Sequence, residues 1–340
     1  MSLQPERHPT RDFFIADIFD NTPFKDDLAS MEHPIFVLSK KKDIRNLEYR
    51  SGDVSIAIKP TTDGLPTIFD KDVLLYCGSL LMQEVNAGRT PPKTLRVSSH
   101  DLLVATNKLT NGDAYRRLRL SLERLQGVSI QTNIKTNKRE INRGFGLIDS
   151  YEVIESSKVK DRMVKLEITL SDWFYNSIVG KEVLTINRDY FRLGKPMERR
   201  LYEIARKHCG KQKEWSINLT RLMEKTGSTS TLRLFRSRMK DIAKDNHLPD
   251  YNIAIDSNDN VSFSQKHSVS EQEELSFDDM PHISPRTLTK ARQLVINAGT
   301  GWDFNALHEQ FTESVLSGFR PDKADGAFIN FVKKKISTSA

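Results

Sequence analysis

The central part of the chain carries apolar residues at the spacing of an amphipathic helix. Tyr115, Leu118, Leu122 and Leu125 recur every three or four positions, and Gly127 ends the pattern. Residues at this spacing lie on one side of an α-helix, so the pattern predicts a helix with one buried face.

Further elements are predicted on both sides of this helix. A shorter helix is expected to begin near Ser99, and the turn sequence TNGD separates it from the long one. Alternation of apolar and polar residues then predicts strands over 128–134 and 146–154, with the loop sequence TNKR between them, and another strand over 163–170. Helix, turn, helix and β-hairpin is the order of a winged helix.

The same pattern recurs later in the chain. Residues 215–227 align with 95–107 at an offset of 120. After a turn that is three residues shorter, the apolar positions of the second long helix align at an offset of 117: Phe235, Met239 and Ile242. A second hairpin is expected over 252–256 and 261–264, so the chain is predicted to contain two copies of one unit.

These patterns predict an α+β protein with two tandem winged-helix domains followed by a small all-helical C-terminal module. Three short helical patterns, over 286–297, 303–317 and 323–336, make up that module. The expected boundaries are an N-terminal arm at 1–30, winged-helix domain 1 at 31–180, winged-helix domain 2 at 181–264, an acidic linker at 265–284 and the helical module at 285–340.

Basic residues on the two long helices are the candidates for DNA contact. On the second helix they share a face away from the apolar one, and hydroxyl residues stand at its N-terminal end, where free backbone N–H groups favour phosphate. The leading candidates are Arg233, Arg236, Lys240, Lys244, Thr229, Ser230 and Thr231. Second are Arg116, Arg117, Arg119 and Arg124 of the first long helix, with Lys135, Lys138, Arg139 and Arg143 at its expected wing tip. The alternative interpretation is that these are ordinary solvated helix faces.

Charge and motif content narrow the class of function. The chain has 52 Lys and Arg against 45 Asp and Glu, a net charge of +7 that suits a polyanionic partner. No phosphate-binding loop of the type GxxxxGK[ST], no zinc spacing around Cys77 and Cys209, and no long apolar run is present. The sequence thus predicts a cytoplasmic protein that uses no cofactor or metal, does not enter the membrane and catalyses no covalent reaction.

Four segments resemble the plasmid-type replication initiator protein A family. They are MEHPIFVLSKKKD at 31–43, the region from Asp53 through IFDKDVLLYCGSLLM, which ends at residue 82, the SHDLL–turn–YRRLRLSLERLQG block, and KPMERRLYEIARKHCG at 195–210. The resemblance extends over 31–255, and the C-terminal part is similar to the tail of such proteins. It implies binding of double-stranded DNA repeats (iterons) at an origin, local melting, recruitment of host replication proteins such as helicase or initiator, and a monomer–dimer equilibrium.

Two alternatives remain open from the sequence. A transcription regulator with the same two units and no replication role would show the same patterns, and autorepression of its own promoter would fit an initiator as well. A nucleic-acid enzyme whose site is assembled in space is the third class.

Overall fold

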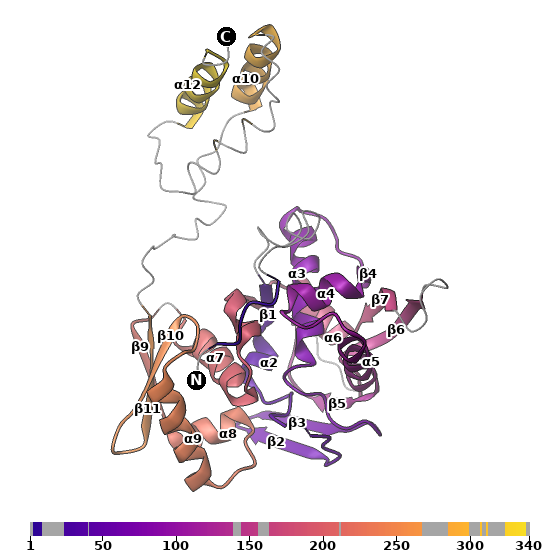
Figure 1. Cartoon of the computed structure of the whole chain (residues 1–340), viewed down its shortest axis with the longest axis vertical. Coiled ribbons are helices and arrows are strands. Elements are labelled where there is room, and N and C mark those ends of the chain that lie inside the picture. Colours follow the sequence, from indigo (N-terminus) through magenta and orange to yellow (C-terminus); the bar gives the residue numbers. More distant parts are fainter. Residues whose placement is uncertain are drawn as a thin grey trace. The chain divides into compact units, whose positions relative to one another are not determined.

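The computed structural model (Figure 1) describes residues 3–8, 24–39, 41–138, 144–155, 163–210, 212–266, 285–298, 307, 311 and 324–337. The chain divides into two compact units, Met1–His267 and Ser268–Ala340. The mixed helix and sheet content of the first unit confirms the predicted α+β class at that level. The predicted boundary near residue 180 lies inside the first compact unit and stays a prediction.

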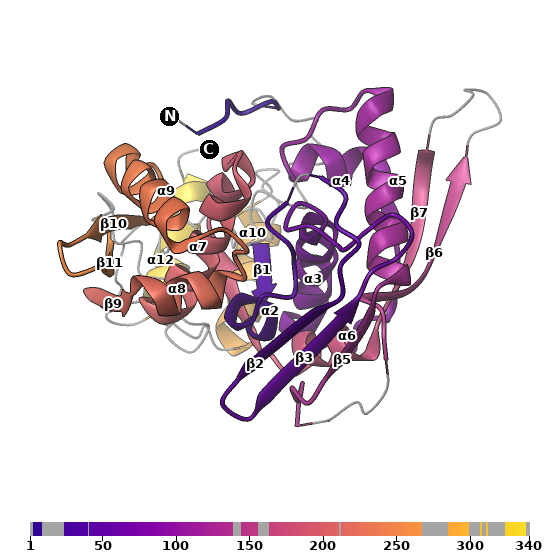
Figure 2. The ribbon, with the colours of Figure 1, turned by 90° about the horizontal axis from the view of Figure 1, so that it is seen from below.

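The first helix–hairpin unit (residues 71–170) contains three helices and a three-stranded antiparallel sheet. In chain order its elements are α3 (Lys71–Asn86), β4 (Thr94–Ser98), α4 (Ser99–Ala105), α5 (Gly112–Gly127), β6 (Ile148–Glu155) and β7 (Met163–Leu170). The strand order is β4-β7-β6, so the first strand pairs with the last one. Figure 2 shows α5 lying alongside the β6–β7 hairpin.

The second helix–hairpin unit (residues 196–265) repeats this plan. Its elements are α7 (Pro196–His208), β9 (Glu214–Asn218), α8 (Leu219–Thr226), α9 (Leu232–Asp245), β10 (Tyr251–Ile255) and β11 (Asn260–Gln265). The strand order β10-β11-β9 again pairs the first strand with the last. Apart from the strand β5 (Ser129–Thr132), which follows α5 and has no counterpart in the second unit, the element order agrees between the two units. The sheet order agrees as well.

The apolar registers of the two long helices are buried as predicted. Leu118, Leu122 and Leu125 are at most 4% exposed on α5, and so are Phe235, Met239 and Ile242 on α9. Both helices begin with a side-chain cap, at Asn111 and at Thr231, whose oxygens accept from a backbone N–H two or three residues into the helix. One buried stripe on each helix leaves the opposite face to solvent.

The first predicted hairpin is wrong in its strands. β5 (Ser129–Thr132) pairs along its length with β3 (Val54–Lys59), which in turn pairs with β2 (Leu47–Ser51). Only an isolated bridge joins Ile130 to Phe145, because β6 pairs with β7 instead. Apolar residues on both β5 and β6 alternate with a period of two, and this period identifies a strand without identifying its partner.

The predicted arm is wrong for its last residues. β1 (Phe24–Asp27) pairs with β8 (Val183–Ile186), and α2 (Leu28–Glu32) follows directly, capped by Asp27. Phe24 and Met31 are buried there. Farther along, α6 (Asp172–Val179) follows β7, and the 3-10 helix η1 (Arg188–Arg192) precedes α7. The N-terminal segment thus belongs to the core of the first compact unit.

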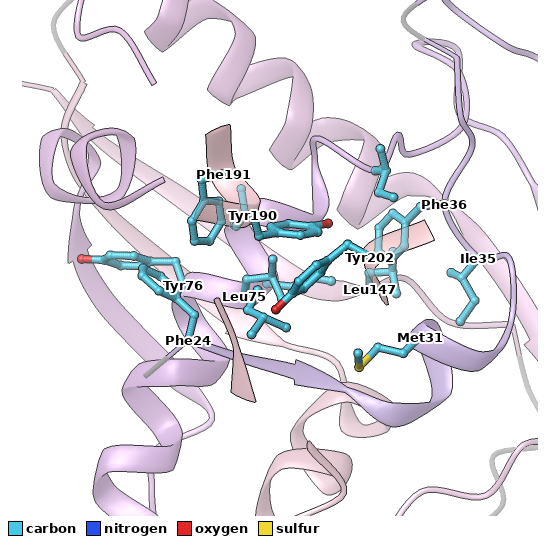
Figure 3. Close-up of a cluster of buried hydrophobic side chains, with 14 of the residues drawn as sticks. Phe24, Met31, Ile35, Phe36, Leu75, Tyr76, Leu147, Tyr190, Phe191 and Tyr202 are labelled. Atoms are coloured by element: carbon cyan, nitrogen blue, oxygen red, sulfur yellow. The ribbon is translucent and has the colours of Figure 1, made fainter. Parts of the chain in front are cut away.

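An aromatic cluster lies where these elements meet (Figure 3). Tyr190 and Tyr202 have their ring centroids 5.6 Å apart, and Phe191 lies edge-on to both Tyr190 and Phe24. The Tyr190 hydroxyl donates to Glu203, and the Tyr202 hydroxyl donates to Asp250, so neither buried hydroxyl lacks a partner. This cluster contains residues of η1, α7 and the N-terminal strand in one core.

Buried charges join α3 to α7. Lys71 of α3 lies 2.7 Å from Asp26 and 3.1 Å from Glu203 of α7, with all three side chains at most 1% exposed. Asp72 of α3 accepts from Arg199 of α7 at 2.6 Å. Because buried ions need a partner of opposite charge, these pairs fix the two helices against each other.

The C-terminal unit has its own small core. α10 (Pro285–Ala298) and α12 (Ala324–Ser337) correspond to the first and third predicted helical patterns. Six apolar side chains form one buried cluster: Ala291, Val295, Leu307, Phe311, Phe328 and Val332. The predicted acidic linker begins too early, because Gln265 belongs to β11, and the linker beyond Lys266 lies outside the described residues. All of the pattern over 303–317 except Leu307 and Phe311 lies outside them as well.

Candidate nucleic-acid interface

Helix α9 presents an open basic face. Arg233, Arg238, Lys240 and Lys244 are exposed, and none of them forms an ion pair with the residues that the structure describes. Arg233, Lys240 and Lys244 follow each other at intervals of seven and four residues, which places them on the side opposite the buried stripe. This side of α9 can accept a polyanion without first breaking an internal contact.

The N-terminal end of α9 is formed by hydroxyl residues. Thr231 caps the helix by accepting from the amide of Leu234, and the hydroxyls of Ser228 and Ser230 lie 3.0 Å apart. Thr229 is exposed. The helix dipole and short polar side chains at this end favour a phosphate oxygen.

Leu234 is an unexpected feature of this face. It stands in the first turn of α9 beside Arg233 and is 46% exposed. Sequence reasoning overlooked it because an apolar residue in a helix is usually assigned to the core. An exposed apolar side chain between cations suits contact with the methyl group of thymine.

Arg236 differs from its neighbours because it has a fixed partner. Its Nε lies 2.8 Å from Oδ1 of Asp259, and its Nη2 lies 2.5 Å from Oδ2. Asp259 stands in the turn between β10 and β11, so the contact joins the helix to the hairpin. The Arg236 hydrogen bond is the main cause that lowers the pKa of Asp259 from its ordinary value.

The second hairpin carries no basic residue. Residues 251–265 contain Asp256 and Asp259 but neither Lys nor Arg. A hairpin that rests on the DNA backbone usually carries cations, since the phosphates are negative. This hairpin is therefore suited to supporting α9 rather than to contacting phosphate.

Helix α5 has fewer available cations than α9. Asp113 lies 2.6 Å from Arg116 and 2.7 Å from Arg117. Arg119 is exposed on the same helix. Acidic residues within the unit thus neutralise part of the basic face that the sequence predicts.

Arg124 does not extend outward as predicted. Its guanidinium makes two hydrogen bonds of 2.8 and 2.7 Å to Asp70, next to the start of α3, and its side chain is 17% exposed. Although burial works in the opposite direction, the hydrogen bonds and charge of Asp70 raise the pKa of Arg124. Ser121 lies three residues earlier, on the same side of α5, and its hydroxyl also donates to Asp70. Arg124 and Ser121 thus fasten this side of α5 to the start of α3.

A groove of about 630 Å³ lies beside the N-terminal half of α5. Cationic residues from several parts of the chain line it: Arg7, Lys41, Lys42, Lys108, Arg116, Arg117, Arg124 and Arg199. Asp113 and Asp70 line it as well, so its charge is mixed.

The predicted wing tip is not a hairpin tip. Lys138 stands in a turn with a φ of 62°, and the preceding amide, of Asn137, donates to Glu182. Arg139 and Arg143 lie outside the described residues, and Lys135 precedes the turn. The segment that joins β6 to β7, residues 156–162, also lies outside them, and its sequence contains Lys158, Lys160 and Arg162. Those three were missed because the hairpin was assigned to other strands.

Neither a cluster of metal ligands nor a membrane-spanning helix occurs among the described residues. No group of three His, Cys, Asp or Glu side chains among them converges as a metal site requires. None of the described helices is long and apolar enough to cross a membrane.

Comparison with known families decides what the chain is. Residues 25–253 match the family described as Replication initiator protein A. The chain belongs to the replication initiator protein A family. This initiator is 42% identical over 261 residues to a protein of Wigglesworthia glossinidia brevipalpis named "Putative replication protein", covering 75% of the chain and 94% of the relative. The resemblance expected from the sequence is confirmed, and with it a role in initiating DNA replication.

Two solved structures are similar to the initiator. They are crystal structures of domains 2 and 3 of RctB, each 14% identical to this chain, with TM-scores of 0.45 and 0.42. The first match covers 70% of this chain and 96% of the solved chain, and the second covers 68% and 95%.

Proposed function

We propose that this initiator binds repeated duplex DNA sites at an origin through two winged helices and places α9 in the major groove. The element order that the two units share apart from β5, and the sheet orders β4-β7-β6 and β10-β11-β9, support the winged-helix assignment. The observation that carries the proposal is the row of exposed, unpaired cations on α9 among the described residues.

In this proposal α5 contributes less binding free energy than α9. Its Arg116 and Arg117 have to exchange Asp113 for phosphate, whereas Arg233 and Lys240 exchange only water and counterions. The sites on the DNA are expected to be repeats, and the same surface would repress the initiator's own promoter.

Opening of the origin is proposed to need no covalent step by this chain. Bending of the DNA, supercoiling and partner proteins would supply the free energy of melting. Host replication proteins are proposed to dock on the C-terminal unit, and the chain is proposed to exchange between monomer and dimer. Nicking of a supercoiled plasmid, or hydrolysis of ATP by the purified protein, would contradict the absence of chemistry.

Footprinting on the DNA that flanks the initiator's own gene tests the binding proposal. The full chain should protect repeated segments, and Arg233→Ala together with Lys240→Ala should weaken the protection at least tenfold, because two phosphate or base contacts are lost. Arg89→Ala, which changes a cation at the C-terminal end of α3, is the matched control. Equal protection by the double variant and the wild type would reject α9 as the reading helix.

A plasmid test separates an initiator from a transcription regulator. A plasmid whose own origin is disabled would carry only this gene and its flanking DNA. Replication that is lost with the double α9 variant supports the initiator. Promoter binding without any replication would favour a transcription regulator with the same two units.

A further inference from the structure

We propose that Asp259 is a positioning residue that fixes the Arg236 guanidinium for recognition of one base pair. This inference rests on the proposed entry of α9 into the major groove. It assigns to the second hairpin the task of supporting an arginine, in place of contact with the DNA backbone.

The geometry leaves the far edge of the guanidinium free to donate. Asp259 accepts from Nε and from Nη2 of Arg236 through two nearly parallel hydrogen bonds. An arginine has five N–H donors, so both hydrogens of Nη1 and one of Nη2 remain. Those remaining donors form the fork that matches O6 and N7 of guanine.

The turn that carries Asp259 is itself fixed by hydrogen bonds. Oδ1 of Asp256 accepts from the amides of Asn258 at 2.9 Å and Asn260 at 2.8 Å. The carbonyl of Asp259 accepts from the amide of Leu219, at the start of α8, at 2.8 Å. The turn that carries the Asp259 carboxylate is therefore held by hydrogen bonds within the hairpin and by one to α8, the helix that precedes α9.

A purely stabilising role fits this pair poorly. The side chains of Arg236 and Asp259 are 34% and 33% exposed, and ion pairs open to solvent contribute little to stability. A bidentate contact at such a site restricts the direction of the guanidinium much more than it adds stability. Restricted direction is what recognition of a single base edge requires.

Charge supports the same assignment. An acidic hairpin tip that rested on phosphates would weaken binding, yet Asp256 and Asp259 both stand at this tip. Because Asp259 pairs with Arg236, the negative charge of Asp259 is compensated by a cation of α9. The hairpin then attracts the DNA phosphates less, but the arginine is better oriented.

Selection from a library of duplexes with a randomised centre tests the proposal, because the selection itself defines the preferred site. The full chain, Arg236→Ala, Arg236→Lys and Asp259→Asn would each be used to enrich bound duplexes, which are then sequenced. Asn accommodates the φ of 59° at position 259 as Asp does, and the carbonyl contact with Leu219 is unchanged. Thermal unfolding of each variant confirms that it folds.

The expected result is a loss confined to one base pair of the selected motif. Arg236→Ala, Arg236→Lys and Asp259→Asn should each lower discrimination at the same position roughly tenfold, since a bidentate contact is lost or loosened. The rest of the motif should be retained. Binding of Asp259→Asn to random-sequence duplex should not weaken, because a negative charge has been removed.

Asp256→Asn is the matched control, since it removes the same charge from the same turn, does not touch Arg236, and keeps an Oδ1 that can accept from the amides of Asn258 and Asn260. A motif that Asp259→Asn leaves intact, a loss that Asp256→Asn shares, or losses at different positions for Arg236 and Asp259 each overturns the proposal. A wild-type chain that enriches no motif would instead reject the proposed function itself, so the two failures are distinguishable.

Discussion

Arg116 and Arg233 occupy matching positions on α5 and α9, yet their surroundings differ. Arg116 shares the carboxylate of Asp113 with Arg117, whereas Arg233 has no ion-pair partner among the described residues. Asp113 lies on α5 three residues before Arg116, whereas Ser230 stands three residues before Arg233. The difference between the two arginines is therefore local to each helix, and the apolar spacing alone does not show it.

Leu234 gives a prediction at this scale. Leu234→Ala should change the free energy of unfolding by less than about 0.5 kcal/mol, because the side chain is already 46% exposed. Affinity for the selected site should fall roughly fivefold through loss of a contact with a thymine methyl group. Urea unfolding and a gel-shift titration measure the two effects.

Ile44→Ala is the control for Leu234, since Ile44 is 65% exposed and far from α9 in sequence. Equal affinity of the Leu234 and Ile44 variants for DNA would remove Leu234 from the interface.

His33 gives a prediction about pH. Burial lowers the pKa of His33 to about 4, against an ordinary value near 6.5. The negative charge of Glu32 works in the opposite direction, and the positive charges of Lys207, Lys225 and Arg200 work in the same direction as burial. The folded state then binds fewer protons than the unfolded state between these values, so this contribution to stability is complete above pH 6.5 and declines as the pH falls toward 4. His33→Gln should reduce the loss of stability over that range by about 1–2 kcal/mol, a figure discounted because the ring is half-buried.

Unfolding by urea at a series of pH values from 7 downward would measure this difference between wild type and variant. Glu32, which accepts from Lys207, Lys225 and His208, has its pKa lowered by these hydrogen bonds against the effect of burial. The contribution of Glu32 to the free energy of unfolding is lost only below about pH 4.5, the ordinary pKa of a glutamate. A loss of stability between pH 6.5 and about 4.5 can therefore be assigned to His33. If the free energy of unfolding declined with pH equally in wild type and His33→Gln, the role given to His33 would be contradicted.

At the scale of elements, the long helices and the second hairpin could be predicted from the sequence, and the strand partners in the first unit could not. The stripes Leu118–Leu122–Leu125 and Phe235–Met239–Ile242 are local, because a helix closes its own hydrogen bonds. The second hairpin was also predictable, since its two strands are separated by a short turn. The first was not, because its strands β6 and β7 are separated by a longer segment and β5 competes for the same role.

The candidate site was predictable to the same extent. Arg233, Lys240 and Lys244 lie outward because their spacing to the buried stripe is fixed by the helix. Arg124 and Arg236 could not be assigned from spacing, since Asp70 and Asp259 reach them from other elements.

The buried charges between α3 and α7 give a prediction for these two elements. Lys71→Met should lower the free energy of unfolding by about 3–5 kcal/mol, because Asp26 and Glu203 would share a buried site without the lysine. Adding Asp26→Asn to this variant should recover part of the loss, since Glu203 keeps Arg200 at 3.1 Å. Urea unfolding of both variants measures the recovery. A loss below about 1 kcal/mol for Lys71→Met alone would contradict the stabilising role given to this buried lysine.

At the scale of the whole molecule, two separate cores predict two separable pieces. A chain that ends after Lys266 keeps the complete large core, and the cluster of Ala291, Phe311 and Phe328 belongs to the other piece. The shortened chain should unfold at the same urea concentration as the corresponding transition of the full chain. It should bind the selected duplex with unchanged affinity and fail to sustain plasmid replication.

Circular dichroism during urea titration, a gel-shift titration and plasmid maintenance would measure these three properties. A shortened chain that still maintains the plasmid would contradict the docking role of the C-terminal unit.

The buried pairs that join α3 to α7 have a consequence for how the initiator lies on its DNA. The two long helices proposed to contact DNA, α5 with partly neutralised arginines and α9 with open cations, are held in one body by Lys71, Asp72 and their partners. Such a body has a head and a tail, so a single chain imposes a direction on the duplex that it covers. Repeats bound by successive chains should then all run the same way along the origin, and reversing one of them should leave its occupant facing against its neighbours.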